Sequence, residues 1–169
     1  MNLVVDVQYG NGAAAVAGIL FEEWNSQRPF EVVTAVESVF GEYEPGAFYK
    51  RELPCIQALL ARIPRVFSTI VIDGYVTLGE EDRPGLGMHL HEAIGGRSAV
   101  IGVAKTRFHG IPPEHEVLRG DSQKQLFVTA VGCSLEQAKS RILAMSGPHR
   151  IPFLIKRADA EARELAKSL

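Results

Sequence analysis

The beginning of the chain shows the two-residue alternation of side chains that predicts β-strands. Along residues 3–9 the odd positions form one apolar face, whereas the other face carries Asp6 between Val4 and Gln8. Gly10-Asn11-Gly12 follows and supplies residues that tolerate the positive φ of a tight hairpin. Three successive antiparallel strands are therefore predicted, the second and third over residues 13–21 and 30–40.

Helical spacing replaces this alternation in the next segment. Apolar residues recur every three or four positions from Leu53 to Ile63. Pro54 is tolerated only in the first turn of a helix, so the helix is predicted to begin just before it. Glu52 then lies at the helix entrance, where the helix dipole by itself favours a carboxylate. Further helices are predicted over residues 85–94, 134–146 and 159–169, of which the second opens with the capping box Ser134-Leu135-Glu136-Gln137.

Two short runs are apolar on both faces, which is typical of strands covered on both sides. Residues 69–73 end at Asp73-Gly74, and residues 98–105 end at Lys105. The right-handed crossover rule places the Asp73 strand beside and parallel to the Asp6 strand. The predicted fold class is α/β: one domain over residues 1–169 with a mixed sheet, in which three antiparallel strands precede parallel strands alternating with helices.

Composition and charge narrow the possibilities only slightly. The chain of 169 residues is 46% hydrophobic and 22% charged, with a formal net charge of -2, so a nucleic-acid partner would need only a local basic patch. Two cysteines are too few for a disulfide framework. No signal peptide and no membrane-spanning run is recognised. We therefore expect a cytoplasmic monomer without a membrane partner.

The candidate chemistry lies in three acidic residues. Aspartate is disfavoured within a strand, so Asp6 indicates either a site or a guard charge on an edge strand. Asp73 follows a central strand, where open α/β sheets bind ligands, although Asp73-Gly74 could also be an ordinary turn. If Asp6, Asp73 and Glu52 meet at one edge, their repulsion favours a divalent cation, and oxygen ligands favour Mg²⁺ or Mn²⁺. Such a site suits in-line phosphodiester hydrolysis.

The order of several short motifs resembles the endonuclease V family, the deoxyinosine-directed nucleases with an RNase H-like fold. Each motif is weak alone, but together they run through most of the chain in the family's order. They are Val5-Asp6-Val7-Gln8-Tyr9, Tyr43-Glu44-Pro45-Gly46, Lys50-Arg51-Glu52-Leu53-Pro54, Val71-Ile72-Asp73-Gly74, Ile101-Gly102-Val103-Ala104-Lys105, Leu118-Arg119 and Ser134-Leu135-Glu136.

The resemblance implies a role for each matching residue. Asp6, Glu52 and Asp73 would bind the metal ion, and Lys105 would steady a phosphate or the attacking water. Tyr43 and Pro45 match the wedge that holds the duplex open, and Gly46 and Gly74 match small residues around the pocket for the flipped base. A hypoxanthine pair is weaker than a normal pair, so its extrusion costs less and contributes to selectivity.

The sequence departs from the family pattern at three places. The loop after Asp73 (residues 74–79) contains no histidine, and residues 129–133 replace a family segment that contains one. Glu42 and Glu44 flank Tyr43 in the wedge, where acidic side chains would repel phosphates.

These departures leave three hypotheses open. The first is a divergent Mg²⁺- or Mn²⁺-dependent endonuclease that cuts DNA or RNA near deaminated bases, with a role in DNA repair and a possible loss of rate. The second is a weak or inactive module that binds nucleic acid or a protein. The third is a nuclease that uses the same metal site on another nucleic-acid structure or on RNA.

Overall fold

The structure, a computed structural model, describes residues 1–38, 44–45 and 47–169. In chain order these residues form β1 (Asn2–Gly10), β2 (Ala13–Phe21), β3 (Glu31–Ser38), α1 (Tyr49–Ala61), β4 (Thr69–Asp73), β5 (Thr77–Leu78), β6 (Arg83–Pro84), α2 (Leu86–Ala93), β7 (Ala99–Ala104), the short 3-10 helix η1 (Pro113–His115), β8 (Glu116–Val117), β9 (Leu126–Val131), α3 (Leu135–Ala144) and α4 (Phe153–Lys167). The three initial strands, their hairpin and the Ser134 capping box are confirmed, except that residues 39–40 of the predicted third strand lie outside the described residues. No strand was predicted between residues 75 and 84 or between residues 109 and 123, and these segments contain the β5–β6 hairpin and η1–β8.

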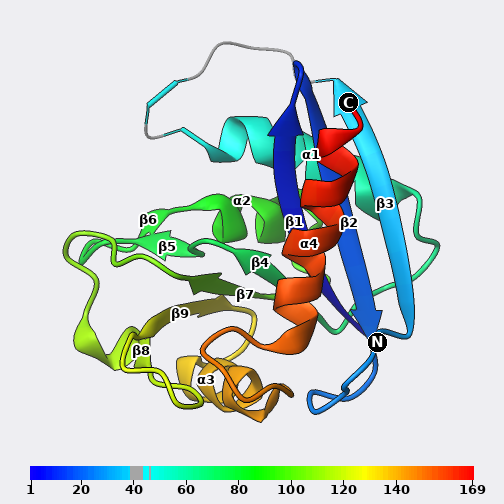
Figure 1. The fold of residues 1–169 in the computed structure, drawn as a ribbon. Helices are drawn as coiled ribbons and strands as arrows, with labels where there is room; N and C mark the ends of the chain where they lie inside the picture. The colour runs from blue at the N-terminus through cyan, green and yellow to red at the C-terminus, as the bar shows by residue number, and fades with distance from the viewer. Residues whose placement is uncertain (39–43, 46) are drawn as a thin grey trace.

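In the described residues, seven strands form one mixed sheet in the order β3-β2-β1-β4-β7-β9-β8 (Figure 1). The first three strands pair antiparallel, β4 pairs parallel with β1 and with β7, and β9 returns antiparallel to β7. The crossover prediction that β4 lies beside and parallel to β1 is therefore confirmed.

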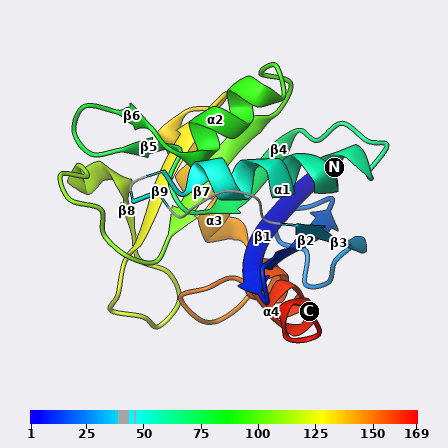
Figure 2. The same cartoon turned by 90° about the horizontal axis from the view of Figure 1, so that it is seen from above.

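Two layers of helices cover the sheet, with α1 and α2 on one face and α3 and α4 on the other (Figure 2). Successive side chains of a strand point to opposite faces, so Leu3 and Val5 pack under α1 and α2, whereas Val4 packs under α4. The same alternation directs Asp6 toward the α4 face. The face on which each strand residue lies is thus set by the strand period alone.

Helix α4 begins at Phe153, six residues before the predicted start at residue 159. Leu154, Ile155, Ala158 and Ala162 form its buried stripe. The prediction was wrong because it began the amphipathic pattern at the alanines and missed the two larger apolar residues of the first turn. Asp159 consequently lies inside the helix and not at its start.

The last turns of α4 lie very close to the end of β1. A Cβ atom added at Gly10 would lie 2.4 Å from the backbone oxygen of Ala166, so only glycine permits this approach. The Asn11 side chain donates a hydrogen bond of 2.7 Å to the Leu169 carbonyl oxygen. Together these contacts hold α4 along β1.

Helix α1 begins at Tyr49, so Pro54 lies in its second turn, contrary to the prediction that it lies in the first. Proline removes one backbone donor, and Pro54 is exposed, so water can reach the carbonyl group that loses its partner. Glu52 remains in the first turn, as predicted. In the part of the chain that the structure describes, none of the helices has the length and apolarity needed to cross a bilayer.

Candidate active site

Asp6 and Asp73 lie side by side at the carboxyl ends of two parallel strands. Val5 of β1 pairs with Ile72 of β4, and the two aspartates are the next residues on their strands. Both follow the same strand period, so both side chains lie on the α4 face. Asp6 is only 7% exposed, whereas Asp73 is partly exposed.

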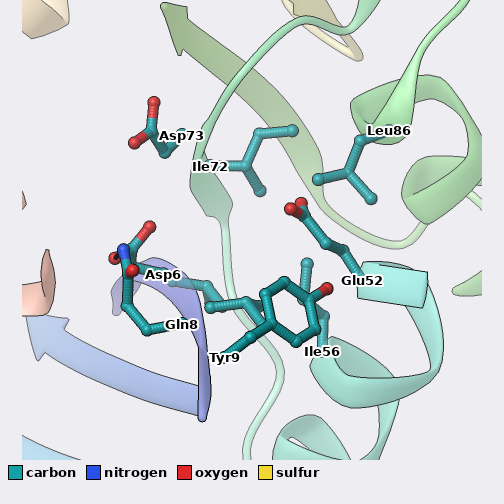
Figure 3. A pocket seen from close by; sticks show the side chains of 10 residues that line it. Asp6, Gln8, Tyr9, Glu52, Ile56, Ile72, Asp73 and Leu86 are labelled. Atoms are coloured by element: carbon teal, nitrogen blue, oxygen red, sulfur yellow. Dashed lines mark hydrogen bonds between the residues drawn. The ribbon is translucent and has the colours of Figure 1, made fainter. Parts of the chain in front are cut away.

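Glu52 comes from the opposite layer, because α1 covers the other face of the sheet. It lines the same cavity of about 290 Å³ as the two aspartates, together with the apolar side chains of Ile56, Ile72 and Leu86. In Figure 3 the carboxylates of Asp6 and Asp73 lie on one side of this cavity and that of Glu52 on the other. The three predicted acids therefore share one cavity, but they enter it from two faces.

Lys105 directly follows β7, the strand beside β4, and lies next to Asp73. Its Nζ atom is 2.9 Å from Asp73 Oδ2, and both side chains are about one third exposed. The ammonium group thus neutralises one of the three predicted acids.

Asp159 is a fourth acid of this region that sequence reasoning missed. Gln8 donates from Nε2 to Asp6 Oδ2 at 3.0 Å and to Asp159 Oδ1 at 3.2 Å, so one amide bridges the two carboxylates. Asp159 also forms an ion pair of 2.9 Å with Arg163, one turn later in α4. The apolar spacing from Leu154 onward would have revealed the helix, but the contact with Gln8 spans 151 residues and has no local signal.

The cavity is unfavourable for negative charge. Burial raises the pKa of Glu52 to about 7, and the charges of Asp6 and Asp73 add to this rise. Burial also raises the pKa of Asp6, to which Asp73 and Asp159 contribute, while the Gln8 hydrogen bond and the charge of Lys105 act in the opposite direction. The Arg163 hydrogen bond instead lowers the pKa of Asp159. A bound cation would relieve the repulsion among these groups.

The chemistry of the donors fits a hard divalent cation, since all four acids offer carboxylate oxygens. In residues 1–38, 44–45 and 47–169, however, no three His, Cys, Asp or Glu side chains are close enough together to hold a metal ion. The physical reason lies in their present partners: Lys105 holds Asp73, Gln8 holds Asp6, and Glu52 enters from the other face. Metal binding would require these side chains to turn toward one another.

The predicted wedge and base pocket are described only in part. Tyr43 and Gly46 lie outside the described residues. Pro45 is exposed, and Glu44 beside it forms an exposed ion pair of 2.6 Å with Lys50. Gly74 has φ of +133°, and a Cβ atom there would meet nothing within 4 Å. Backbone conformation, and not lack of space, is thus the reason for glycine at position 74.

The histidine-free loop after Asp73 is held by Tyr75. Its hydroxyl group donates to the Thr106 carbonyl oxygen at 2.6 Å and accepts from the Phe108 backbone nitrogen at 3.0 Å. These two bonds join the segment after β4 to the segment after β7. Tyr75 thereby supports the adjacent strand ends that carry Asp73 and Lys105.

Residues 129–133 are the second place where the family pattern has a histidine. Thr129 Oγ1 accepts a hydrogen bond of 2.8 Å from the Val76 backbone nitrogen in the loop after Asp73, and the rest of the segment leads away from the acids. Val131 pairs with Val100, at the start of β7, and Lys105 comes five residues later, which is roughly 17 Å along a strand. Ser134 then caps α3. A histidine at positions 131–133 would therefore lie toward the opposite end of β7 from Lys105.

Arg119, part of another matching motif, stabilises the fold through hydrogen bonds to the backbone. It is 5% exposed and donates to the carbonyl oxygens of Ile142, Met145 and His149. Burial lowers the pKa of its guanidinium group. Arg119 therefore joins the segment after β8 to the end of α3 and the loop that leads to α4.

Comparison with known proteins identifies the family of the chain. The sequence model described as Endonuclease V matches residues 3–160. The Endonuclease V of Streptomyces coelicolor is 32% identical over 151 residues, which are 77% of this chain and 63% of that protein. The chain thus spans less than two thirds of that relative's length.

Solved structures show the same fold. The crystal structure of Endonuclease V from Streptomyces avermitilis has a TM-score of 0.79 at 28% identity, over 98% of this chain and 81% of that one. Endonuclease V of Ciona intestinalis, in complex with a 24mer DNA that contains an inosine followed by a ribo-adenosine, also gives 0.79, at 21% identity over 99% and 86% of the two chains. The predicted RNase H-like mixed sheet is confirmed, and the chain belongs to the endonuclease V family.

Proposed function

We propose that this protein is a metal-dependent endonuclease that hydrolyses a phosphodiester bond near a deaminated base in DNA or RNA and thereby acts in DNA repair. The observation that carries the proposal is the meeting of Asp6, Glu52 and Asp73 at one cavity, with Lys105 in contact with Asp73. Family membership supports it independently.

In this proposal the acids hold the cation and Lys105 binds the phosphate. Asp6, Glu52 and Asp73 would be the ligands of Mg²⁺ or Mn²⁺. Asp159, which Gln8 joins to Asp6, would support these ligands. A bound cation supplies Lewis-acid stabilisation of the phosphate charge and lowers the pKa of the attacking water. Lys105, which pairs with Asp73 in the structure, would supply the ammonium group that contacts a phosphate oxygen.

The proposed substrate follows from the relatives. The Ciona intestinalis enzyme was crystallised with inosine-containing DNA, and we extend this substrate class to the present chain. Base extrusion would involve Tyr43 and Pro45 as the wedge and Gly46 and Gly74 around the flipped base. A weak hypoxanthine pair reduces the cost of that extrusion.

The test is cleavage of matched inosine-containing and plain oligonucleotides, single- and double-stranded, with Mg²⁺ and with Mn²⁺. We expect nicking that requires both inosine and metal ion and that Asp73→Asn reduces by at least about 100-fold. Glu23→Gln is the matched control, because it removes one exposed charge in the loop at the other end of the sheet. Equal activity of Asp73→Asn and the native chain would refute the assignment of the site.

One observation favours a second function, a nucleic-acid-binding module without cleavage. Asp73 is already paired with Lys105, and the described acids are not gathered around a common point. Under this alternative, oligonucleotides bind without metal ion, no substrate is cut, and calorimetric titration with Mn²⁺ gives no heat that depends on Asp6 or Asp73.

A further inference from the structure

A second cavity adjoins the acidic one and plays no part in the proposed chemistry. Its volume is about 450 Å³, within the range of small-ligand pockets. It shares Lys105 and Asp159 with the candidate active site and extends from them along the first turns of α4. The residues that line it are Lys105, His149, Arg150, Ile151, Phe153, Ile155, Lys156 and Asp159.

The wall of this cavity is held in place by hydrogen bonds to neighbouring segments. Arg150 donates to the carbonyl oxygens of Lys105 and of Gln125, the residues that follow β7 and precede β9. These bonds fix the loop before α4 against the edge of the sheet. Phe153 is the first residue of α4, and its backbone nitrogen donates to the Ser146 carbonyl oxygen at 2.9 Å.

The cavity combines an apolar surface with a positive rim. Phe153 is 44% exposed, although it is a large aromatic side chain, and Ile151 and Ile155 lie beside it in the lining. Lys156 is exposed, and within the described residues its ammonium group has no hydrogen-bond or ion-pair partner. His149 is also exposed and lies 3.4 Å from Asp121. Since Arg163 pairs with Asp159, the one acid of the lining, the rim has a net positive charge.

An aromatic face next to an unpaired cation suits single-stranded nucleic acid, because every base has a face that can stack and every nucleotide carries a phosphate. We propose that this cavity holds one nucleotide of the strand that is cut, next to the scissile phosphate, with its base stacked on Phe153 and its phosphate at Lys156. The proposal rests on the proposed function for the identity of the strand. It adds a nucleotide subsite on the α4 side of the acidic cavity.

The test measures binding without cleavage, so that it does not depend on catalysis. Fluorescence anisotropy with EDTA present gives the Kd of a labelled single-stranded inosine oligonucleotide and of a series with one abasic nucleotide at each successive position. We expect one position at which the abasic nucleotide weakens binding to the native chain about tenfold but leaves binding to Phe153→Ala unchanged. Phe153→Trp should retain the base effect and Phe153→Leu should lose it, which separates stacking from the burial of apolar area.

Lys156→Gln tests the phosphate contact. Loss of one phosphate contact should reduce the slope of log Kd against log salt by about 0.7, whereas Lys124→Gln, at an exposed site without cavity contacts, should leave it unchanged. Phe30→Ala is the matched aromatic control, since Phe30 is 54% exposed outside the cavity. Abasic effects that are the same in Phe153→Ala and in the native chain overturn the subsite. Loss of cleavage in all variants, with these binding effects intact, would instead count against the proposed function.

Discussion

The two ends of the parallel strands β1 and β4 carry different kinds of polar side chain. At the amino ends, Asn2 and Thr69 are buried and neutral, and each has a partner: Asn2 Nδ2 donates to the Glu22 carbonyl oxygen at 3.0 Å, and Arg141 donates to Thr69 Oγ1 at 3.3 Å. At the carboxyl ends, Asp6 and Asp73 are charged neighbours, and burial together with repulsion raises the pKa of Asp6.

This difference separates stability from function within one pair of strands. A buried neutral group with a hydrogen-bond partner costs little, whereas a buried carboxylate next to a second carboxylate opposes folding. Such local conflicts are expected where a ligand will resolve them. The amino ends thus stabilise the sheet, and the carboxyl ends retain a repulsion that a bound cation would remove.

Removal of a charge at the carboxyl ends of β1 and β4 should give the largest effect. Asp6→Asn should reduce metal-dependent cleavage by at least about 100-fold, because one of the proposed ligands loses its charge. The same change should increase the free energy of unfolding without metal ion by on the order of 1 kcal/mol at pH 8, since repulsion falls while Asn can still accept from Gln8. Urea unfolding and the oligonucleotide assay measure both effects, and a less stable, fully active variant would contradict the comparison.

The reciprocal exchange at the amino end is Asn2→Asp. A carboxylate cannot donate to the Glu22 carbonyl oxygen and would be buried without a partner, so the free energy of unfolding should fall by about 3 kcal/mol. Cleavage per folded molecule should not change. A loss of cleavage without loss of stability would show that the two ends are not separate.

Asp159 tests whether α4 belongs to the acidic end. Asp159→Asn should reduce cleavage about 10- to 100-fold, as loss of a residue that supports the metal ligands does. Glu161→Gln is the matched control, because both acids form an i,i+4 ion pair with an arginine of α4. Equal rates for the two variants would exclude Asp159 from the site.

The smallest effect is the pH dependence of the metal-free protein. The pKa of Glu52 is raised to about 7 in the folded state from an ordinary value of 4.5. Protonated Glu52 therefore favours the folded state: this contribution is complete below pH 4.5 and is lost as the pH rises through about 7. The free energy of unfolding of Glu52→Gln, measured with urea relative to the native chain, should therefore be higher at pH 8 than at pH 5 by on the order of 1 kcal/mol. Mn²⁺ binding near pH 6 should release a proton, and no proton release would contradict the raised pKa.

Much of the fold was predictable because its signals are local. The alternation in β1, the Asn11-Gly12 turn with φ of 45° and 79°, and the Ser134 capping box are each set by residues within a few positions of one another. The strand period also explains why Asp6 shares a face with Asp73. The start of α1 was misjudged because an exposed proline is tolerated in a second turn when water can solvate the freed carbonyl group.

The sequence by itself therefore determined β1 to β4 and β7, most of the helices and the neighbouring positions of Asp6 and Asp73. Only the tertiary structure decided that Glu52 faces them across the cavity, that Lys105 pairs with Asp73 and that Gln8 joins Asp6 to Asp159. These contacts depend on where helices α1 and α4 lie along the sheet. That position is set by close packing between distant segments, such as Gly10 against Ala166, which no local pattern of apolar and polar residues encodes.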